Sequence, residues 1–203
     1  MIIHREKIIP LALIAAFLLS ISLTAFALEI VETPVPKEPM QGPFPPPFIL
    51  TSAGQGPGAA LIRAMLELRA RREAGFAPLA TAEDLPDKGS VLIAIGISEK
   101  GMEAAGTSLS DETSRLKELL LKASDNKLAV LLFQAGTRSA RQATPEAFLR
   151  MAFPYAHAII TKEPEDNREL VESLAEEHSV KLIEIGSYSQ LQEVLNSLLQ
   201  DTE

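Results

Sequence analysis

The stretch FILTSAGQGPGAALIRAML, residues 48–66, decides the fold. It begins with the apolar run Phe48–Leu50, passes through the glycine-rich turn Thr51–Gly58, and continues after Pro57 into an apolar stripe with helical spacing. Proline suits the first position of a helix, because its missing N–H would have no partner there. The sequence therefore predicts a buried strand, a tight turn and a helix in direct succession, as in parallel β-α-β units.

Short apolar runs recur along the rest of the chain and alternate with amphipathic stretches. Runs without polar alternation are typical of strands that are covered on both faces of a sheet. Phe76–Leu79 is a weaker candidate, because Pro78 interrupts it. Besides Phe48–Leu50, the predicted strands are Val91–Ile97, Leu128–Phe133, Ala158–Ile160 and Lys181–Ile185.

Signals for helix starts separate these runs. Ser110-Asp111-Glu112 places a cap and two acids at the positive end of a helix, and Thr144-Pro145-Glu146 begins another. The spacings Asp166-x-x-Glu169 and Ser187-x-x-Gln190 resemble capping boxes. Alternating strands and helices predict an α/β fold: a single Rossmann-like (flavodoxin-like) three-layer domain with a mostly parallel sheet of five or six strands.

The first 27 residues have the pattern of a secretory signal. Arg5 and Lys7 precede the apolar run Ile8–Phe26, and Ala25-Phe26-Ala27 matches an A-x-A cleavage site. The same run is also long enough for an uncleaved membrane anchor. Both alternatives export the rest of the chain to the periplasm or the cell surface, in the second case tethered to the membrane through residues 8–26.

A proline-rich segment follows the leader. Residues 28–47 hold seven of the chain's 14 prolines, a composition typical of an extended, semi-rigid spacer. A motif for the aromatic groove of a partner protein is the alternative use of such tracts. We expect three parts: a signal peptide or anchor (1–27), a proline-rich linker (28–47) and a single α/β domain (48–203).

The charge and the absence of cysteine exclude several classes of function. A net charge of −8 disfavours binding to nucleic acids or anionic membranes, whose phosphates would repel the protein. A chain without cysteine has no lipidated cysteine, no disulfide, no thiolate metal site and no cysteine nucleophile. We therefore expect contact with a membrane only through the N-terminal segment.

The glycine turn lies where parallel α/β sheets bind ligands, beyond the carboxyl end of a strand. It satisfies G-x-G-x-x-A, but the acidic residue that a dinucleotide needs about 20 residues later is not well placed, and no lysine follows as in a P-loop. Two alternatives stay open. The N–H groups at the helix start capture an anion or carboxylate, or the glycines only shape a tight turn. We expect no cofactor.

Cations gather at the same edge of the predicted sheet. Arg138 and Arg141 share one short loop, where two guanidinium groups can grip a carboxylate or phosphate bidentately. Lys100 and Lys162 come from neighbouring loops, although acidic residues of those loops could pair with the cations instead. We predict a site for a small anionic ligand made of Ser52, Gly54, Gln55, Ser98, Lys100, Gly101, Gly136, Arg138 and Arg141.

Catalytic and metal-binding patterns are sparse. Ser52 follows a strand as a nucleophile would, but no G-x-S-x-G surrounds it and no histidine is placed to activate it. His178 lies at a predicted helix end, and His157 precedes a strand at the opposite edge of the sheet. Neither histidine is convincing as a base or a metal ligand. We expect no metal site and favour a protein that is not an enzyme.

Four segments together resemble a known family. ILTSAGQ (49–55), GISEKGMEAAG (96–106), FQAGTRSAR (133–141) and AHAIITKEPEDN (156–167) are similar to an uncharacterised family of exported bacterial proteins, the domain of unknown function with family number 6305. The resemblance covers most of residues 48–185 and implies a signal or lipoprotein leader followed by one Rossmann-like domain. It assigns no catalytic residue. The chain departs from the family in lacking a lipid-anchoring cysteine and in Ile97, where a second glycine is expected.

The sequence leaves three functional hypotheses. The leading one is an extracytoplasmic domain that binds a small anionic metabolite at the carboxyl edge of its sheet. The first alternative is a protein–protein interaction module of the cell envelope, which predicts an exposed apolar patch. The second alternative is a hydrolase or transferase that uses Ser52.

Overall fold

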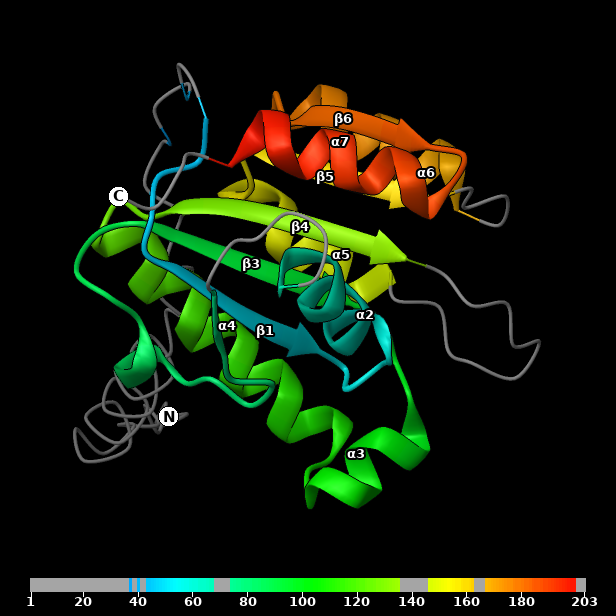
Figure 1. The fold of residues 1–203 in the computed structure, drawn as a ribbon. Helices are drawn as coiled ribbons and strands as arrows, with labels where there is room; N and C mark the ends of the chain where they lie inside the picture. Colours follow the sequence, from blue (N-terminus) through cyan, green and yellow to red (C-terminus); the bar gives the residue numbers. More distant parts are fainter. Residues whose placement is uncertain are drawn as a thin grey trace, which may run out of the picture. The chain divides into compact units, whose positions relative to one another are not determined.

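The computed structural model describes residues 37, 40, 43–67, 74–135, 146–162 and 167–199. All of them belong to the unit Pro34–Glu203. Its centre is a sheet of six parallel strands in the order β2-β1-β3-β4-β5-β6 (Figure 1). The strands are β1 (Phe48–Ala53), β2 (Ala74–Phe76), β3 (Ser90–Ile95), β4 (Ala129–Ala135), β5 (Ala158–Lys162) and β6 (Lys181–Ile185).

Two helices cover one face of this sheet. α2 (Gly58–Met65) contributes Ile62 and α7 (Tyr188–Leu198) contributes Leu195 to an apolar cluster around Phe133. Burying a side chain of this size contributes about 1.5–3 kcal/mol. This cluster is therefore one of the two main sources of stability in the domain.

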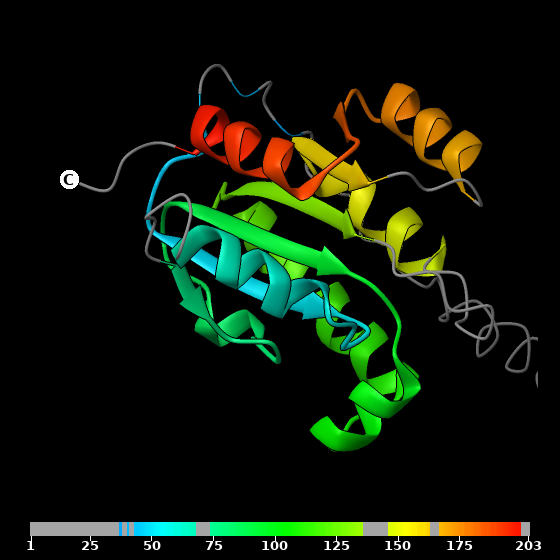
Figure 2. The same cartoon turned by 45° about the vertical axis from the view of Figure 1, so that its right-hand side comes forward.

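Three helices cover the opposite face. α4 (Leu109–Asp125), α5 (Glu146–Ala152) and α6 (Arg168–Glu177) pack against a second cluster around Leu132 and Ile159 (Figure 2). All residues of β1 and β3 are buried, as strands covered on both faces require. The predicted α/β fold, a Rossmann-like three-layer domain with a parallel sheet of six strands, is confirmed.

Several strands and helices have other bounds than the sequence predicts. β1 continues through Thr51 and Ser52 to Ala53. The weak strand expected at Phe76–Leu79 is instead β2, which ends at Phe76 before Pro78. The segment after β3, expected as a loop, forms the short helix α3 (Glu99–Ala105) beyond the carboxyl end of the strand (Figure 1).

Capping residues determine where the helices begin. α4 begins at Leu109, because the Ser108 hydroxyl accepts the N–H of Asp111 while the Asp111 carboxylate accepts the N–H of Ser108. The cap was expected two residues later, at Ser110. The predicted capping box of α7, Ser187-x-x-Gln190, is present. The expected cap of α5, Thr144-Pro145, lies outside the described residues, as does Asp166. α6 begins after Asn167, one residue later than the cap expected at Asp166, and the Asn167 side chain forms no capping hydrogen bond.

The last residues of the proline-rich segment pack onto the domain. Phe44 is fully buried in the α2–α7 cluster, and its N–H donates to the backbone oxygen of Leu198 at 2.6 Å. The hydroxyl of Ser90 donates to the backbone oxygen of Pro45 at 2.6 Å. The domain therefore begins before the boundary expected at Phe48, because Phe44 completes one of its two apolar clusters.

Of the helices in the described ranges, none combines the length and the apolar character that crossing a membrane requires. The expected signal peptide or anchor, residues 1–27, lies outside those ranges. Export and tethering therefore stay predictions from the sequence.

Candidate functional site

The carboxyl ends of β1 and β3 form the switch point of the sheet. β2 lies on one side of β1 and β3 on the other, so the strand order reverses there. The turns that follow these two strands contact each other directly. The N–H of Gly56 donates to the backbone oxygen of Gly96 at 2.8 Å, and the N–H of Ser98 donates to that of Gly54 at 2.8 Å. Folds of this kind place ligands at this point.

Glycines permit the close approach of the two turns. A Cβ on Gly101, in α3, would lie 2.1 Å from the backbone oxygen of Gln55, and a Cβ on Gly56 would lie 2.6 Å from that of Gly96. Gly54 has a φ of 89°, a conformation that glycine adopts without steric cost. Gly54 and Gly101, which were expected to bind a ligand, are thus required by the packing of the chain itself.

Replacing Gly101 with alanine should destabilise the domain. The new methyl group would meet the backbone of Gln55, so we expect the free energy of unfolding to fall by about 1–3 kcal/mol. Urea denaturation measures this loss. Gly58→Ala is the matched control, because its Cβ would lie at an ordinary 3.7 Å from the Cβ of Ala94. Equal stability of the two variants would contradict the packing role of Gly101.

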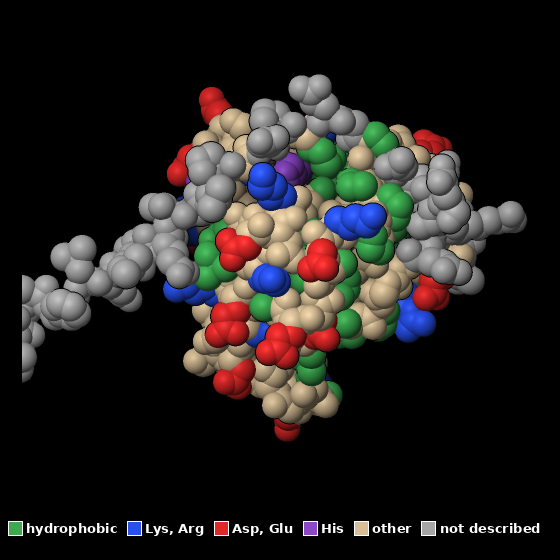
Figure 3. All heavy atoms as spheres, turned by 90° about the vertical axis from the view of Figure 1, so that its left-hand side faces the viewer, with side chains coloured by type: hydrophobic (Ala, Val, Ile, Leu, Met, Phe, Trp, Pro, Cys, Tyr) green, Lys and Arg blue, Asp and Glu red, His purple; other side chains and the backbone are tan. Residues whose placement is uncertain are grey.

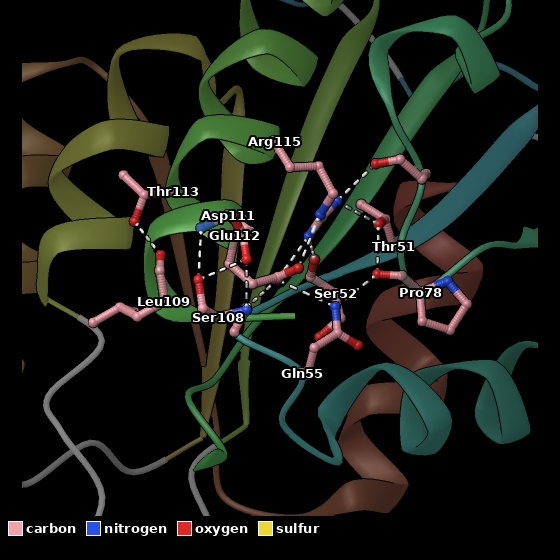
Figure 4. A network of polar contacts seen from close by, with 12 residues as sticks. Thr51, Ser52, Gln55, Pro78, Ser108, Leu109, Asp111, Glu112, Thr113 and Arg115 are labelled. Atoms are coloured by element: carbon pink, nitrogen blue, oxygen red, sulfur yellow. Dashed lines mark hydrogen bonds and ion pairs between the residues drawn. The ribbon is translucent and has the colours of Figure 1, made fainter. Parts of the chain in front are cut away.

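A carboxylate of the protein itself occupies the glycine turn. Glu112, on α4, is fully buried. Its Oε2 accepts the N–H of Gly54 at 2.9 Å and the side-chain N–H of Gln55 at 3.1 Å (Figure 4). The turn therefore captures an anion, as free N–H groups at such a place favour, but that anion belongs to the chain. From the sequence, Glu112 is expected only as an acid at the positive end of a helix.

Arg115 compensates the buried charge of Glu112. Its Nε and one terminal nitrogen donate to the two carboxylate oxygens at 3.0 and 2.9 Å. The same guanidinium donates to the backbone oxygens of Ser52 at 2.5 Å and Ala80 at 2.7 Å (Figure 4). Through Arg115, the first part of α4 is hydrogen-bonded both to the end of β1 and to the segment before η2 (Ala82–Asp84). The sequence signal for this burial is that Glu112 shares the apolar stripe of α4 with Leu116, Leu119, Leu120 and Ala123.

The other expected site residues have separate surroundings. Ser52 is the register partner of Ala94, and its buried hydroxyl has no hydrogen-bond partner among the described residues. The Ser98 hydroxyl caps α3 by accepting the N–H of Gly101 at 3.0 Å. Lys100 is exposed and forms no ion pair within the described ranges. The remaining three, Gly136, Arg138 and Arg141, lie outside the described residues.

Two buried polar side chains lie next to each other at the carboxyl ends of β4 and β5. Gln134 is 6% exposed and Thr161 is 1% exposed, and the two are register partners. They follow Leu132 and Ile159 by two residues, so they point to the face that α4, α5 and α6 cover. Neither the Gln134 Oε1 nor the Thr161 Oγ1 has a hydrogen-bond partner among the described residues. A buried polar atom in this condition costs about 1–3 kcal/mol, which makes the pair a candidate site for polar ligand atoms.

Histidine and carboxylate side chains form no metal-binding group within the part of the chain that the structure describes. His157 lies before β5 at the amino edge of the sheet, where its Nδ1 accepts the N–H of Val130 at 3.1 Å. His178 lies at the end of α6. Because neither ring contacts the Ser52 hydroxyl, no described histidine activates that serine.

The comparison with protein families gives one match. A family model described as "Domain of unknown function (DUF6305)" matches residues 45–199. The resemblance predicted from the loop motifs is confirmed. The match also begins ahead of Phe48, in agreement with the packing of the proline-rich segment. No curated protein and no solved structure matches the chain.

Proposed function

The chain belongs to this family, DUF6305, and we propose that its domain binds a small anionic metabolite outside the cytoplasm, beyond the carboxyl ends of β4 and β5. The observation that carries the proposal is the pair Gln134 and Thr161, two adjacent buried side chains whose oxygen atoms have no hydrogen-bond partner among the described residues. Native proteins rarely leave such atoms unpaired. A ligand that supplies the missing hydrogen bonds would remove the cost of this arrangement.

The pair has the chemistry to hold the oxygen atoms of an anion. The Thr161 hydroxyl can donate a hydrogen bond to an oxygen of the anion. As placed, the Gln134 Oε1 accepts a hydrogen bond from an O–H or N–H of the ligand, and a rotated amide would instead donate from its NH₂ group. Both groups are almost fully buried. Hydrogen bonds in such surroundings are electrostatically stronger than in water.

Cationic residues that follow β3 and β4, at the carboxyl edge of the sheet, favour an anion over a neutral ligand. Arg138 and Arg141 follow Ala135, the last residue of β4, by three and six positions in the sequence. Guanidinium groups bind carboxylates and phosphates bidentately. Lys100, after β3, is an exposed cation without an ion-pair partner in the described ranges. The glycine turn after β1 has no part in this proposal, because Glu112 already uses the N–H of Gly54.

A thermal-shift panel of small carboxylates and phosphates tests the proposal. A ligand at about 100 times its Kd adds about 2.7 kcal/mol to the stability of the domain, which raises Tm by several degrees. Thr161→Val removes the hydroxyl and keeps the shape of the side chain, so it should reduce this shift. The pair Arg138→Ala and Arg141→Ala should abolish it.

The matched control for Thr161→Val is Ser52→Ala. It also removes a buried hydroxyl at the carboxyl edge that has no hydrogen-bond partner among the described residues, but this hydroxyl lies on the face that α2 and α7 cover. The shift should be unchanged in this variant. No shift with any anion, or an equal shift in Thr161→Val and the parent chain, would contradict the proposal.

The alternative of an envelope interaction module has less support. It predicts an exposed apolar patch, whereas Leu79 and Leu109 are the large apolar side chains that are exposed among the described residues. Gentle extraction from the native host separates the two functions. Recovery of the protein as a soluble monomer without a co-purifying protein would exclude the interaction module. Recovery of the protein from the periplasmic fraction would support export.

A further inference from the structure

A cavity of about 660 Å³ lies at the opposite edge of the sheet, where β3 and β4 begin. Figure 3 looks onto this edge. The volume falls in the range of small-molecule sites, about 300–1,000 Å³. The segment before β1, the turn before β3, the end of α4 and the start of β5 supply its walls. None of its lining residues belongs to the anionic site proposed above.

His157 presents a hydrogen-bond donor in the wall of this cavity. Its Nδ1 accepts the N–H of Val130 at 3.1 Å, so the neutral ring carries its proton on Nε2. Burial, together with the nearby charge of Lys37, lowers the pKa of His157 and keeps the ring neutral near pH 7. The Nε2–H has no partner among the described residues. It is therefore available to an acceptor in the cavity.

Lys37 is a half-buried cation without a carboxylate partner in the described ranges. Its ammonium group donates to the backbone oxygen of Ala156 and, at 3.5 Å, to that of Phe153. An ammonium group has three donors, so one N–H is left for another acceptor. Burial lowers the pKa of Lys37 to about 8, which reflects the cost of holding this charge away from water. An anion bound beside it would offset that cost.

The remaining lining combines further positive charge with apolar surface. Lys88 and Lys127 line the cavity together with Lys37, and Asp125 is the one carboxylate among the described lining residues. Met40, Leu128 and other apolar residues complete the described walls. We propose that this cavity binds a small carboxylate with an apolar body, whose head contacts Lys37 and His157 and whose body lies on the apolar wall. A carboxylate fits better than a phosphate, because Lys37 and His157 offer one donor to each of its two oxygen atoms, whereas Lys88 and Lys127 are exposed.

Isothermal titration of the purified chain with hexanoate at pH 7 tests this site. Acetate has the same head without the body, and hexanamide has the same body without the charge. Hexanoate should bind about tenfold more tightly than either, since burial of its methylene groups and a charge-assisted hydrogen bond each contribute. Amide NMR signals of Leu128, Ala129, Val130 and His157 should shift during the titration.

Variants then assign the binding to the cavity. Lys37→Met should lower the affinity for hexanoate about tenfold. Lys117→Met removes an exposed lysine of α4 outside the cavity and should leave this affinity unchanged. Ser124→Phe should block binding by filling the space. Thr161→Val should leave it unchanged, which separates this site from the one at the carboxyl edge. Absent binding, equal affinity for hexanamide, or unchanged affinity in both Lys37→Met and Ser124→Phe would overturn the proposal.

Discussion

Replacing Glu112 with alanine should lower the free energy of unfolding by about 3–5 kcal/mol, the cost of breaking a buried ion pair by removing one partner. Arg115 would keep its hydrogen bonds to the backbone oxygens of Ser52 and Ala80 but lose the charge that compensates it. The N–H of Gly54 would also lose its acceptor. Urea denaturation, followed by circular dichroism, measures the loss.

Two controls separate burial from charge in this experiment. Glu146→Ala breaks the exposed pair with Arg150, whose side chains are 48% and 56% exposed, and should cost less than about 1 kcal/mol. The double variant Glu112→Met with Arg115→Met should recover part of the loss, because apolar residues often replace a buried pair without net cost. A loss in Glu112→Ala no larger than that in Glu146→Ala would show that the pair does not hold the switch point together.

Replacing Phe44 with alanine should cost about 3–5 kcal/mol, as for other large side chains removed from a core. Phe44 is fully buried between strands and helices of the α2–α7 cluster, and it belongs to a segment whose composition predicts a spacer. A spacer residue would contribute almost nothing to stability. The same denaturation measurement therefore decides where the domain begins.

The control for Phe44→Ala is Leu109→Ala, at a large apolar side chain that is 49% exposed. We expect this variant to lie within about 0.5 kcal/mol of the parent chain. If Phe44→Ala behaved like Leu109→Ala, the residues before Phe48 would be a linker and not a part of the core.

The fold was predictable because burial on both faces removes polar alternation from the strands. β1 was expected to end at Leu50, because Thr51 and Ser52 interrupt the apolar run although both are buried. Phe44 was missed for a related reason, since the surrounding prolines indicate a spacer. In both cases a local pattern misjudged which side chains are covered, and for β1 it also placed the end of the strand three residues too early.

The site was less predictable, because it depends on contacts between distant segments. Charged residues are mostly exposed, so a glutamate in the first turn of a helix predicts a favourable interaction with the helix dipole. Only the apolar stripe of α4 and the arginine three residues later indicate that Glu112 is buried. Gln134 and Thr161 begin predicted loops, and their burial follows from the helices that cover this face.

A ¹H–¹⁵N NMR titration of the labelled chain with phosphate and with succinate tests the central claim, that a ligand binds beyond β4 and β5 while Glu112 fills the switch point. We predict that the amide signals of Gln134 and Thr161 shift with ligand concentration and that those of Gly54 and Gln55 do not. The largest shifts at Gly54 and Gln55, with none at Gln134 and Thr161, would contradict the account.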